Sequence, residues 1–288
     1  MDGKATRAQA IKAFYARAAA GRSLEEQLAT VRETGGHGAF SVLRAGALAA
    51  QGIASPKPRA DFCLVFGCYR PFTTPQLLGQ AVRLFEALGL EYTWLPDESC
   101  CGLPLVSQAT GDERKAMLSA ARGFIEDNRS RAQARGAQRL VYCCAGCAQA
   151  AKELVGDTGD QYLLDTLIDA LSSALQGALQ GRKLVGAGRV AYFEGCHTSY
   201  KAQFPAVDLN WKRYREFLGS VPGLELCDVS GLCCKHVPGE VVERALAQGA
   251  QRLVCACSGC VAGLRAAAQG RIALVSYPEL LLETLSLG

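Results

Sequence analysis

Apolar residues in this chain alternate between short uninterrupted runs and longer stretches with helical spacing. The short runs lack polar alternation, which is typical of strands covered on both faces, and they occupy residues 63–66, 139–142, 189–193 and 252–254. Between them, apolar positions recur at helical spacing over residues 75–88, 112–135, 209–218 and 240–248. Strands that alternate with helices predict an α/β fold with parallel strands.

The chain repeats itself from residue 61 onward. The sequence GAQRLV at residues 136–141 recurs unchanged at residues 249–254, and a cysteine pattern recurs with it. Each copy reads C-x(n)-C-C-x(m)-C-x-x-C, with n of 31 and m of 42 in the first copy and n of 36 and m of 22 in the second. An identical hexapeptide beside the same cysteine pattern indicates a duplication. We therefore predict two tandem units, at residues 61–185 and 186–288.

Residues 1–60 contain no cysteine and form a separate segment in this interpretation. Helical spacing extends over residues 6–32, a glycine-rich stretch follows at 35–38, and two prolines near residue 57 mark a linker. We expect an N-terminal helical extension. It either packs on the body of the protein or docks a partner subunit, and the first alternative is the simpler one.

Composition narrows the function classes. The 288 residues carry 31 basic and 27 acidic side chains, a formal net charge of +4 with no block of Lys and Arg, which argues against a nucleic-acid partner. No run resembles a secretion signal or a membrane span, so we expect a cytoplasmic protein with no transmembrane segment. In a reducing compartment, clusters among the 14 cysteines are expected to bind metal or carry out redox chemistry.

The repeated cysteines fall at or just after predicted strand ends. Ligands of open parallel sheets bind at the carboxyl ends of the strands, so each copy is expected to gather five thiols at one edge. A structural zinc site closes with four ligands, which either copy could supply. A fifth thiol and two adjacent cysteines instead favour two metal atoms or a bridge between them, and soft thiolates suit iron–sulfur clusters.

The C-x(31)-CC-G…C-x-x-C arrangement resembles the cysteine-rich CCG domain that occurs twice in the B subunit of heterodisulfide reductase, and the resemblance covers residues 61–288. It implies two Rossmann-like CCG units. Each can hold a non-cubane 4Fe-4S cluster, whose two halves share a bridging thiolate from the cysteine pair. The ligands implied for the first cluster are Cys68, Cys100, Cys101, Cys144 and Cys147. Those implied for the second are Cys196, Cys233, Cys234, Cys257 and Cys260.

The second copy departs from this pattern, because Lys235 and His236 follow its cysteine pair where the first copy has Gly102. Its connection to Cys257 is also 20 residues shorter, which predicts a shortened helix. Another cluster type or zinc is therefore the alternative at the second site. The departure also suggests chemistry: Lys235 could hold an anionic substrate, and His236 or His197 could deliver a proton. Each of these side chains could equally be a solvated surface residue.

The resemblance implies an oxidoreductase subunit that acts on disulfides, thiols or a related small sulfur-containing substrate. Its partners would be a ferredoxin-like iron–sulfur subunit and a flavin-containing subunit, because this chain has neither a ferredoxin-type cysteine run nor a G-x-G-x-x-G motif that opens a helix. Relatives of the family also serve in quinone-linked complexes. Two alternatives therefore stay open: an electron-transfer subunit that passes electrons to a quinone or a partner enzyme, and a zinc-stabilised assembly module.

Four further cysteines lie outside the repeated pattern. We expect Cys63 and Cys227 to be small apolar core residues, as free cysteines commonly are. Cys143 and Cys255 are next to repeated cysteines or close to them, so each could replace a ligand, although a core position is the simpler expectation.

Overall fold

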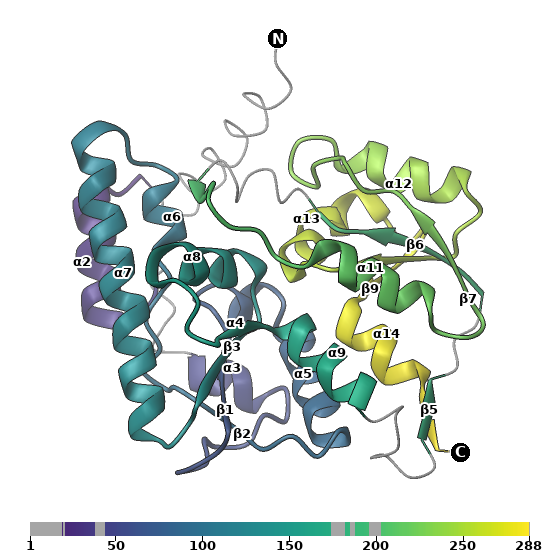
Figure 1. Cartoon of the computed structure of the whole chain (residues 1–288). Coiled ribbons are helices and arrows are strands. Elements are labelled where there is room, and N and C mark those ends of the chain that lie inside the picture. Colours follow the sequence, from purple (N-terminus) through teal and green to yellow (C-terminus); the bar gives the residue numbers. More distant parts are fainter. Residues whose placement is uncertain are drawn as a thin grey trace. The chain divides into compact units, whose positions relative to one another are not determined.

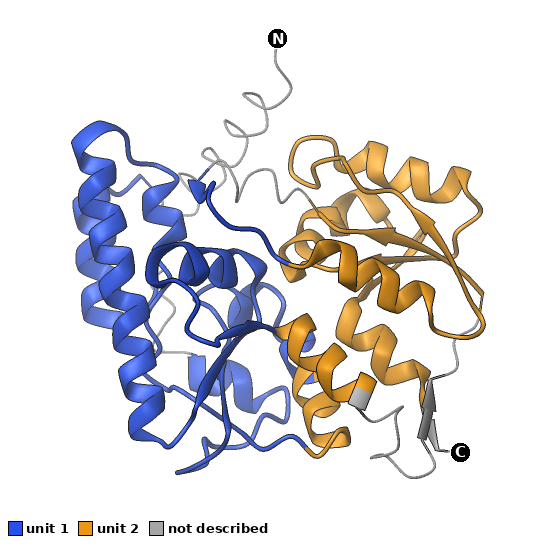
Figure 2. Ribbon diagram, in the orientation of Figure 1, with its two compact units in different colours: residues 1–79, 90–162, 198–209 blue, residues 80–89, 163–197, 210–288 orange. Residues whose placement is uncertain are grey.

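The computed structural model describes residues 19, 21–37, 44–173, 182–184, 188–195 and 203–287. The chain forms two compact units, which are coloured separately in Figure 2. Unit 1 comprises residues 1–79, 90–162 and 198–209, and unit 2 comprises residues 80–89, 163–197 and 210–288. Each unit therefore contains segments that are distant in the sequence.

Unit 1 is built on a four-stranded parallel sheet with the strand order β2-β1-β3-β4 (Figure 1). Its strands are β1 (Phe62–Val65), β2 (Tyr92–Trp94), β3 (Arg139–Tyr142) and β4 (Gln161–Tyr162). Its helices are α2 (Leu24–Thr34), α3 (Arg44–Ala49), α4 (Arg70–Thr73), α6 (Leu103–Val106), α7 (Gly111–Ala134) and α8 (Ala145–Val155). Helix α5 (Pro75–Ala87) is divided between the two units after Gly79. Helices α7 and α8 pack on each other and on β3.

Unit 2 contains a second four-stranded parallel sheet, with the strand order β7-β6-β8-β9. Its strands are β6 (Gly188–Phe193), β7 (Leu224–Asp228), β8 (Arg252–Cys255) and β9 (Ala273–Ser276). Its helices are α9 (Leu163–Ser173), α11 (Trp211–Gly219), α12 (Pro238–Ala247), α13 (Ser258–Ala268) and α14 (Tyr277–Thr284). A separate antiparallel pair consists of β5 (Arg182–Leu184) and β10 (Leu285–Leu287).

The two sheets correspond strand for strand. The central pairing β1–β3 has Val65 opposite Tyr142, and the equivalent pairing β6–β8 has Phe193 opposite Cys255. These pairs occupy the same place in the two copies of the repeated sequence. The prediction of an α/β fold with two tandem parallel units is therefore confirmed. The predicted strand at 139–142 has the observed bounds, and the helix predicted at 75–88 extends from 75 to 87.

The N-terminal segment differs from the expected helix over residues 6–32. Helix α2 starts only at Leu24, because Gly21 has a positive φ of 77° and Ser23 caps the helix with an extended backbone. Ser23 and Glu26 form a capping box, and the helix ends at Gly35 in a left-handed conformation. The predicted helical residues 6–18 lie outside the described residues. The described part packs on unit 1, since α2 contacts α6 and buries Val31.

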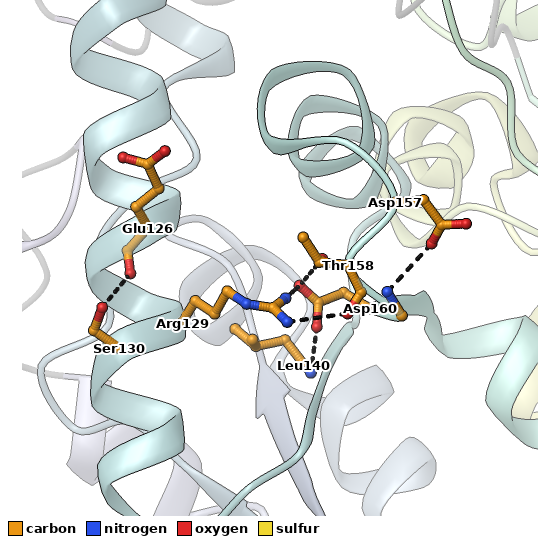
Figure 3. Close-up of polar contacts among 8 residues, drawn as sticks. Glu126, Arg129, Ser130, Leu140, Asp157, Thr158 and Asp160 are labelled. Carbon is orange, nitrogen blue, oxygen red and sulfur yellow. Dashed lines mark hydrogen bonds and ion pairs between the residues drawn. The ribbon is translucent and has the colours of Figure 1, made fainter.

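A buried polar junction fastens α7 to the end of the sheet in unit 1 (Figure 3). The carboxylate of Asp160 accepts hydrogen bonds from the Leu140 backbone N–H at 3.0 Å and from the Thr158 hydroxyl at 2.7 Å. It also forms an ion pair with Arg129 on α7, and the Asp160 side chain is only 6% exposed. The junction fixes the start of β3, the strand that leads to Cys144.

None of the helices in the described ranges combines the length and the apolar character needed to cross a bilayer.

Candidate functional site

The first cysteine set lies beyond the carboxyl ends of three neighbouring strands in unit 1. Cys68 follows β1, the pair Cys100 and Cys101 follows β2, and Cys144 follows β3. Cys144 is the N-cap of α8, which places Cys147 in the first turn of that helix, at its positive end. The structure therefore brings all five predicted ligands of the first site to one edge of the sheet, as expected for a parallel sheet.

The five sulfurs form an unbroken line of contacts. Cys68 Sγ lies 3.2 Å from Cys100 Sγ. Cys100 is hydrogen-bonded to Cys101, Cys101 to Cys147, and Cys147 to Cys144. The adjacent cysteines occupy the middle of the line, and each of them reaches toward a different end.

The pKa of Cys101 is shifted in the opposite direction to those of its two neighbours in this line. Hydrogen bonds from Cys100 and Cys147 lower the pKa of Cys101 well below its usual range. The same bonds, together with burial, raise the pKa of Cys100 and of Cys147. The neighbouring thiols therefore stabilise the thiolate form of Cys101.

A buried carboxylate holds the loop of Cys68 to the loop of the cysteine pair. Glu98, two residues before Cys100, is 1% exposed and accepts hydrogen bonds from the backbone N–H groups of Phe66 at 2.9 Å and Gly67 at 2.7 Å. Its own carbonyl oxygen accepts a bond from the buried Arg44 side chain at 2.8 Å. Burial raises the pKa of Glu98, whereas Arg44 and the two N–H groups lower it.

The backbone of the cysteine pair is fixed from two further directions. The side chain of Asn128 on α7 bonds both the N–H and the carbonyl of Ser99, each at 2.7 Å. The N–H of Cys100 donates to the carbonyl oxygen of Gly35, at the end of α2, at 2.6 Å. Part of the N-terminal segment is thus a structural component of the first site.

Gly102, directly after the pair, is required by packing and by backbone conformation. Its φ is +74°, and a Cβ at this position would lie 2.3 Å from the Cβ of Ala121 on α7. A real Cβ cannot approach another carbon so closely, so α7 can pass the cysteine pair only where residue 102 has no side chain. The contact is with a helix that supports the site.

The second cysteine set repeats half of the sulfur line. Cys234 Sγ lies 3.4 Å from Cys260 Sγ, and Cys260 is hydrogen-bonded to Cys257, the N-cap of α13. Cys233, which directly precedes Cys234 in the chain, is also buried. A Cβ on Gly195 would lie 2.6 Å from the sulfur of Cys260, so the backbone closely approaches the thiols here. The remaining predicted ligand, Cys196, and the neighbouring His197 lie outside the described residues.

The edge of the second set is built differently, as the shorter spacing predicts. In unit 1, α6 and the 24-residue α7 separate the cysteine pair from the C-x-x-C segment, whereas unit 2 has only the 10-residue α12 there. Lys235 and His236 form the turn before α12. Lys235 is half-buried and His236 is exposed.

Unit 2 also replaces the carboxylate that fastens the loops of unit 1. Gly231 stands two residues before Cys233, where the first copy has Glu98. The N–H of Glu194, which corresponds to that of Phe66, donates instead to the hydroxyl of Ser230 at 3.0 Å. The Glu194 side chain is 7% exposed and forms an ion pair with Arg215.

The cysteines outside the repeat occupy core or strand positions. Burial raises the pKa of Cys63 on β1 to about 12 and raises that of Cys227 on β7, whose sulfur lies 3.6 Å from the Val190 carbonyl oxygen. Cys143 and Cys255 are buried, and burial raises the pKa of both well above the usual range. All four keep protonated, weakly nucleophilic thiols at neutral pH.

The side chains of the first set that could bind a metal are thiols, each of which contacts one or two neighbouring thiols. Across the ranges that the structure describes, no three His, Cys, Asp or Glu side chains are grouped as ligands of one metal ion. The five thiols of the first set nevertheless provide soft ligands side by side, with their loops held in place from several directions. That donor chemistry fits a cluster in which different sulfurs bind different metal atoms.

Comparison with known proteins agrees with this geometry. Residues 64–150 match the CCG family, described as a cysteine-rich domain. This match contains all five thiols of the first set, and it confirms the domain resemblance for that copy.

Two kinds of curated relatives share part of the chain. The D subunit of the dihydromethanophenazine:CoB–CoM heterodisulfide reductase of Methanosarcina acetivorans is 32% identical over 95 residues, which are 33% of this chain and 22% of the relative. The C subunit of the anaerobic glycerol-3-phosphate dehydrogenase of Escherichia coli K12 is 26% identical over 176 residues, 58% of this chain and 41% of the relative. The chain thus spans less than half the length of these relatives. Both relatives are subunits of redox enzymes, and the specific resemblance to the B subunit of heterodisulfide reductase stays a prediction.

Several residues that build the first site carry no recognisable signal in the sequence. Glu98 and Asn128 act on backbone groups about 30 residues away. The position of Glu98 two residues before the cysteine pair is the one clue that could have drawn attention to it.

Proposed function

We propose that this chain is an iron–sulfur subunit of a heterodisulfide reductase-like complex that carries out redox chemistry between disulfides and thiols. Two 4Fe-4S clusters of the non-cubane type would be held by the two cysteine sets. The observation that carries this proposal is the line of five sulfurs in unit 1, with the adjacent pair in its middle. The kinship with a heterodisulfide reductase subunit supports the sulfur substrate.

The residues of the first set suit such a cluster better than a single zinc ion. A zinc site needs four ligands around one point, whereas the pair Cys100 and Cys101 reaches toward opposite ends of the sulfur line. When bound, the cluster would supply electrons and an iron atom able to take up a substrate sulfur. The protein's part is to hold the thiols in register, through Glu98, Asn128 and the carbonyl of Gly35.

At the second site, Lys235 is proposed to hold an anionic substrate and His236 or His197 to supply a proton. The half-buried position of Lys235 directly after Cys234 supports a charge effect on whatever the thiols bind. Lys235→Gly should lower the reduction potential of the second site and weaken binding of an anionic disulfide, and leave the first site unchanged. Unchanged potentials together with unchanged substrate kinetics would make Lys235 a surface residue.

Anaerobic purification with quantitative iron, acid-labile sulfide and zinc analysis tests the cofactor. We expect a brown protein with about eight irons per chain, four for each cysteine set. Fewer than two irons per chain with stoichiometric zinc would refute the cluster and favour a zinc-stabilised assembly module. The proposed partners are a ferredoxin-like iron–sulfur subunit and a flavin-containing subunit, which would supply the electrons.

A second candidate function is electron transfer to a quinone or a partner enzyme. The longer of the two kinships, over 58% of the chain, is with a subunit of a dehydrogenase whose name refers to no sulfur substrate. Assays of the loaded chain with an artificial electron donor separate the two functions. Turnover of small disulfides supports the first, and reduction of quinone analogues without disulfide turnover supports the second.

A further inference from the structure

A line of polar side chains in unit 1 runs from Tyr69 to Gln108, which lies just beyond the end of α6. The hydroxyl of Tyr69, the residue after Cys68, lies 2.6 Å from Nδ1 of His37. Nε2 of the same imidazole lies 2.7 Å from Oε1 of Gln27 on α2, and that oxygen also accepts a bond from Gln108 at 2.8 Å. The His37 side chain belongs to a residue with no solvent exposure. Both of its ring nitrogens are occupied, so it is not a metal ligand in this arrangement.

The backbone at the far end of this line fixes the direction of its hydrogen bonds. Nε2 of Gln27 donates to the carbonyl oxygen of Arg22 at 2.9 Å, so the amide oxygen of Gln27 must be the atom that faces His37. An amide oxygen can only accept, and therefore Nε2 of His37 carries the proton. Burial, followed by the charge of Arg22, lowers the pKa of His37 to about 4, which leaves the imidazole neutral at neutral pH. Its Nδ1 then has a lone pair and accepts the hydroxyl proton of Tyr69.

Tyr69 directly follows Cys68 in the chain, and its hydroxyl is part-buried. Burial raises the pKa of Tyr69, and the charges of Cys68 and Cys100 raise it further. These two sulfurs form one end of the sulfur line, where their separation is 3.2 Å. Because a part-buried hydroxyl needs an acceptor, the sulfurs of a loaded site would be the alternative to Nδ1 of His37.

We propose that His37 is a positioning residue of the first site, which directs the hydroxyl proton of Tyr69 away from the sulfurs of Cys68 and Cys100. This inference rests on the proposed function, because its consequence concerns a bound cluster. Hydrogen bonds to cluster sulfurs raise the reduction potential. By taking the proton of Tyr69, His37 keeps the potential of the first site low, from a segment that lies outside the CCG match.

Redox titration of the loaded chain tests the proposal with a double-mutant cycle. His37→Leu removes the acceptor and should shift the potential of the first site upward. Tyr69→Phe removes the donor and should leave that potential near the wild-type value, and the double variant should return to it. His37→Gln keeps a donor and an acceptor in place and should resemble the wild type. The second site, in unit 2, serves as the internal reference, because both residues belong to unit 1.

A second measurement needs no metal. The chain has three histidines, so nitrogen NMR of the histidine-labelled, metal-free protein can be assigned with the His37→Gln variant. We expect His37 to carry its proton on Nε2, and Tyr69→Phe to change the Nδ1 signal. A proton on Nδ1 would overturn the proposal, as would an unchanged potential in His37→Leu or an equal upward shift in the double variant. A chain without iron would refute the proposed function, whereas the NMR result would still decide the hydrogen-bond direction.

Discussion

Replacing Gly102 by alanine should destabilise unit 1 far more than the addition of one methyl group suggests. The new Cβ would lie 2.3 Å from the Cβ and 2.8 Å from the Cα of Ala121, well inside contact distance. Overpacking of this kind costs about 1–3 kcal/mol. The left-handed backbone, with φ of +74°, adds about 1–2 kcal/mol for any residue with a Cβ. We therefore expect a loss of about 2–5 kcal/mol in the free energy of unfolding.

Alanine variants of two other glycines separate the cost of overpacking from the cost of the left-handed backbone. Gly111 has a φ of +55° and open space around it, so its alanine variant should show only the backbone cost of about 1–2 kcal/mol. Gly123, inside α7 with no atom within 4 Å of its new Cβ, should gain about 0.5–1 kcal/mol from alanine. If Gly102→Ala costs no more than Gly111→Ala, the close approach of α7 to the cysteine pair is refuted.

Urea unfolding followed by tryptophan fluorescence measures these differences in unit 1 alone. The two tryptophans are Trp94 in unit 1 and Trp211 in unit 2, so a Trp211→Phe background leaves Trp94 as the reporter. Equal urea dependence among the variants is required before midpoints are converted to free energies. A further variant, Ala121→Gly in the Gly102→Ala chain, should recover only part of the packing loss, because the Cα of residue 121 still lies 2.8 Å from the new Cβ. Glycine inside α7 also costs about 0.5–1 kcal/mol.

Three further predictions concern the same unit. Cys101→Ala should abolish the spectrum of a non-cubane cluster, because the cysteine pair is proposed to supply the bridging thiolate. Cys63→Ala should keep its iron, since Cys63 lies outside the repeated pattern. Equal iron loss in the two variants would show that the assignment of the ligands is wrong. Relative to His37→Gln, the wild type should lose about 3 kcal/mol in the free energy of unfolding as the pH drops from 6.5 to about 4, because only the unfolded chain protonates His37 in that window. Urea titrations of the two proteins across this pH range measure the difference. Asp160→Ala should cost about 3 kcal/mol by leaving Arg129 without its buried partner, and a change below about 1 kcal/mol in the free energy of unfolding would contradict this.

Predictions from the sequence succeeded where a residue pattern acts locally. The run at 139–142 is a strand because its apolar residues are covered on both faces, and the C-x-x-C spacing places both thiols at a helix start. Strand β7 was missed, because Glu225 and Asp228 interrupt its apolar run at the edge of the sheet. The helix expected across residues 21–23 was wrong, since Gly21 has a positive φ and Ser23 caps the helix that begins at Leu24.

The sequence was sufficient to predict which thiols form the first set, but not which residues hold them in place. Cysteine spacing identifies the ligands of the first set, since thiols at strand ends share one edge of a parallel sheet. The groups that hold those thiols bond to backbone atoms, which have no signature in a sequence. The roles of Glu98, Asn128 and His37 therefore emerge only when residues about 30 positions apart are brought together.

The way the sulfur line is assembled has a consequence for how such proteins can diverge. The thiols come from three separate loop ends, so insertions and deletions between the loops can lengthen or remove whole helices without moving a sulfur. The described half of the second set shows this freedom, because Cys234 still meets Cys260 although 22 residues separate the pair from C-x-x-C, where the first copy has 42. The two residues inside C-x-x-C have no such freedom, because the first turn of α8 or α13 sets the distance between the thiols. Searches that fix the long spacings will therefore overlook copies such as the second one, whereas searches that fix only the helix-start motif and the adjacent pair will find both.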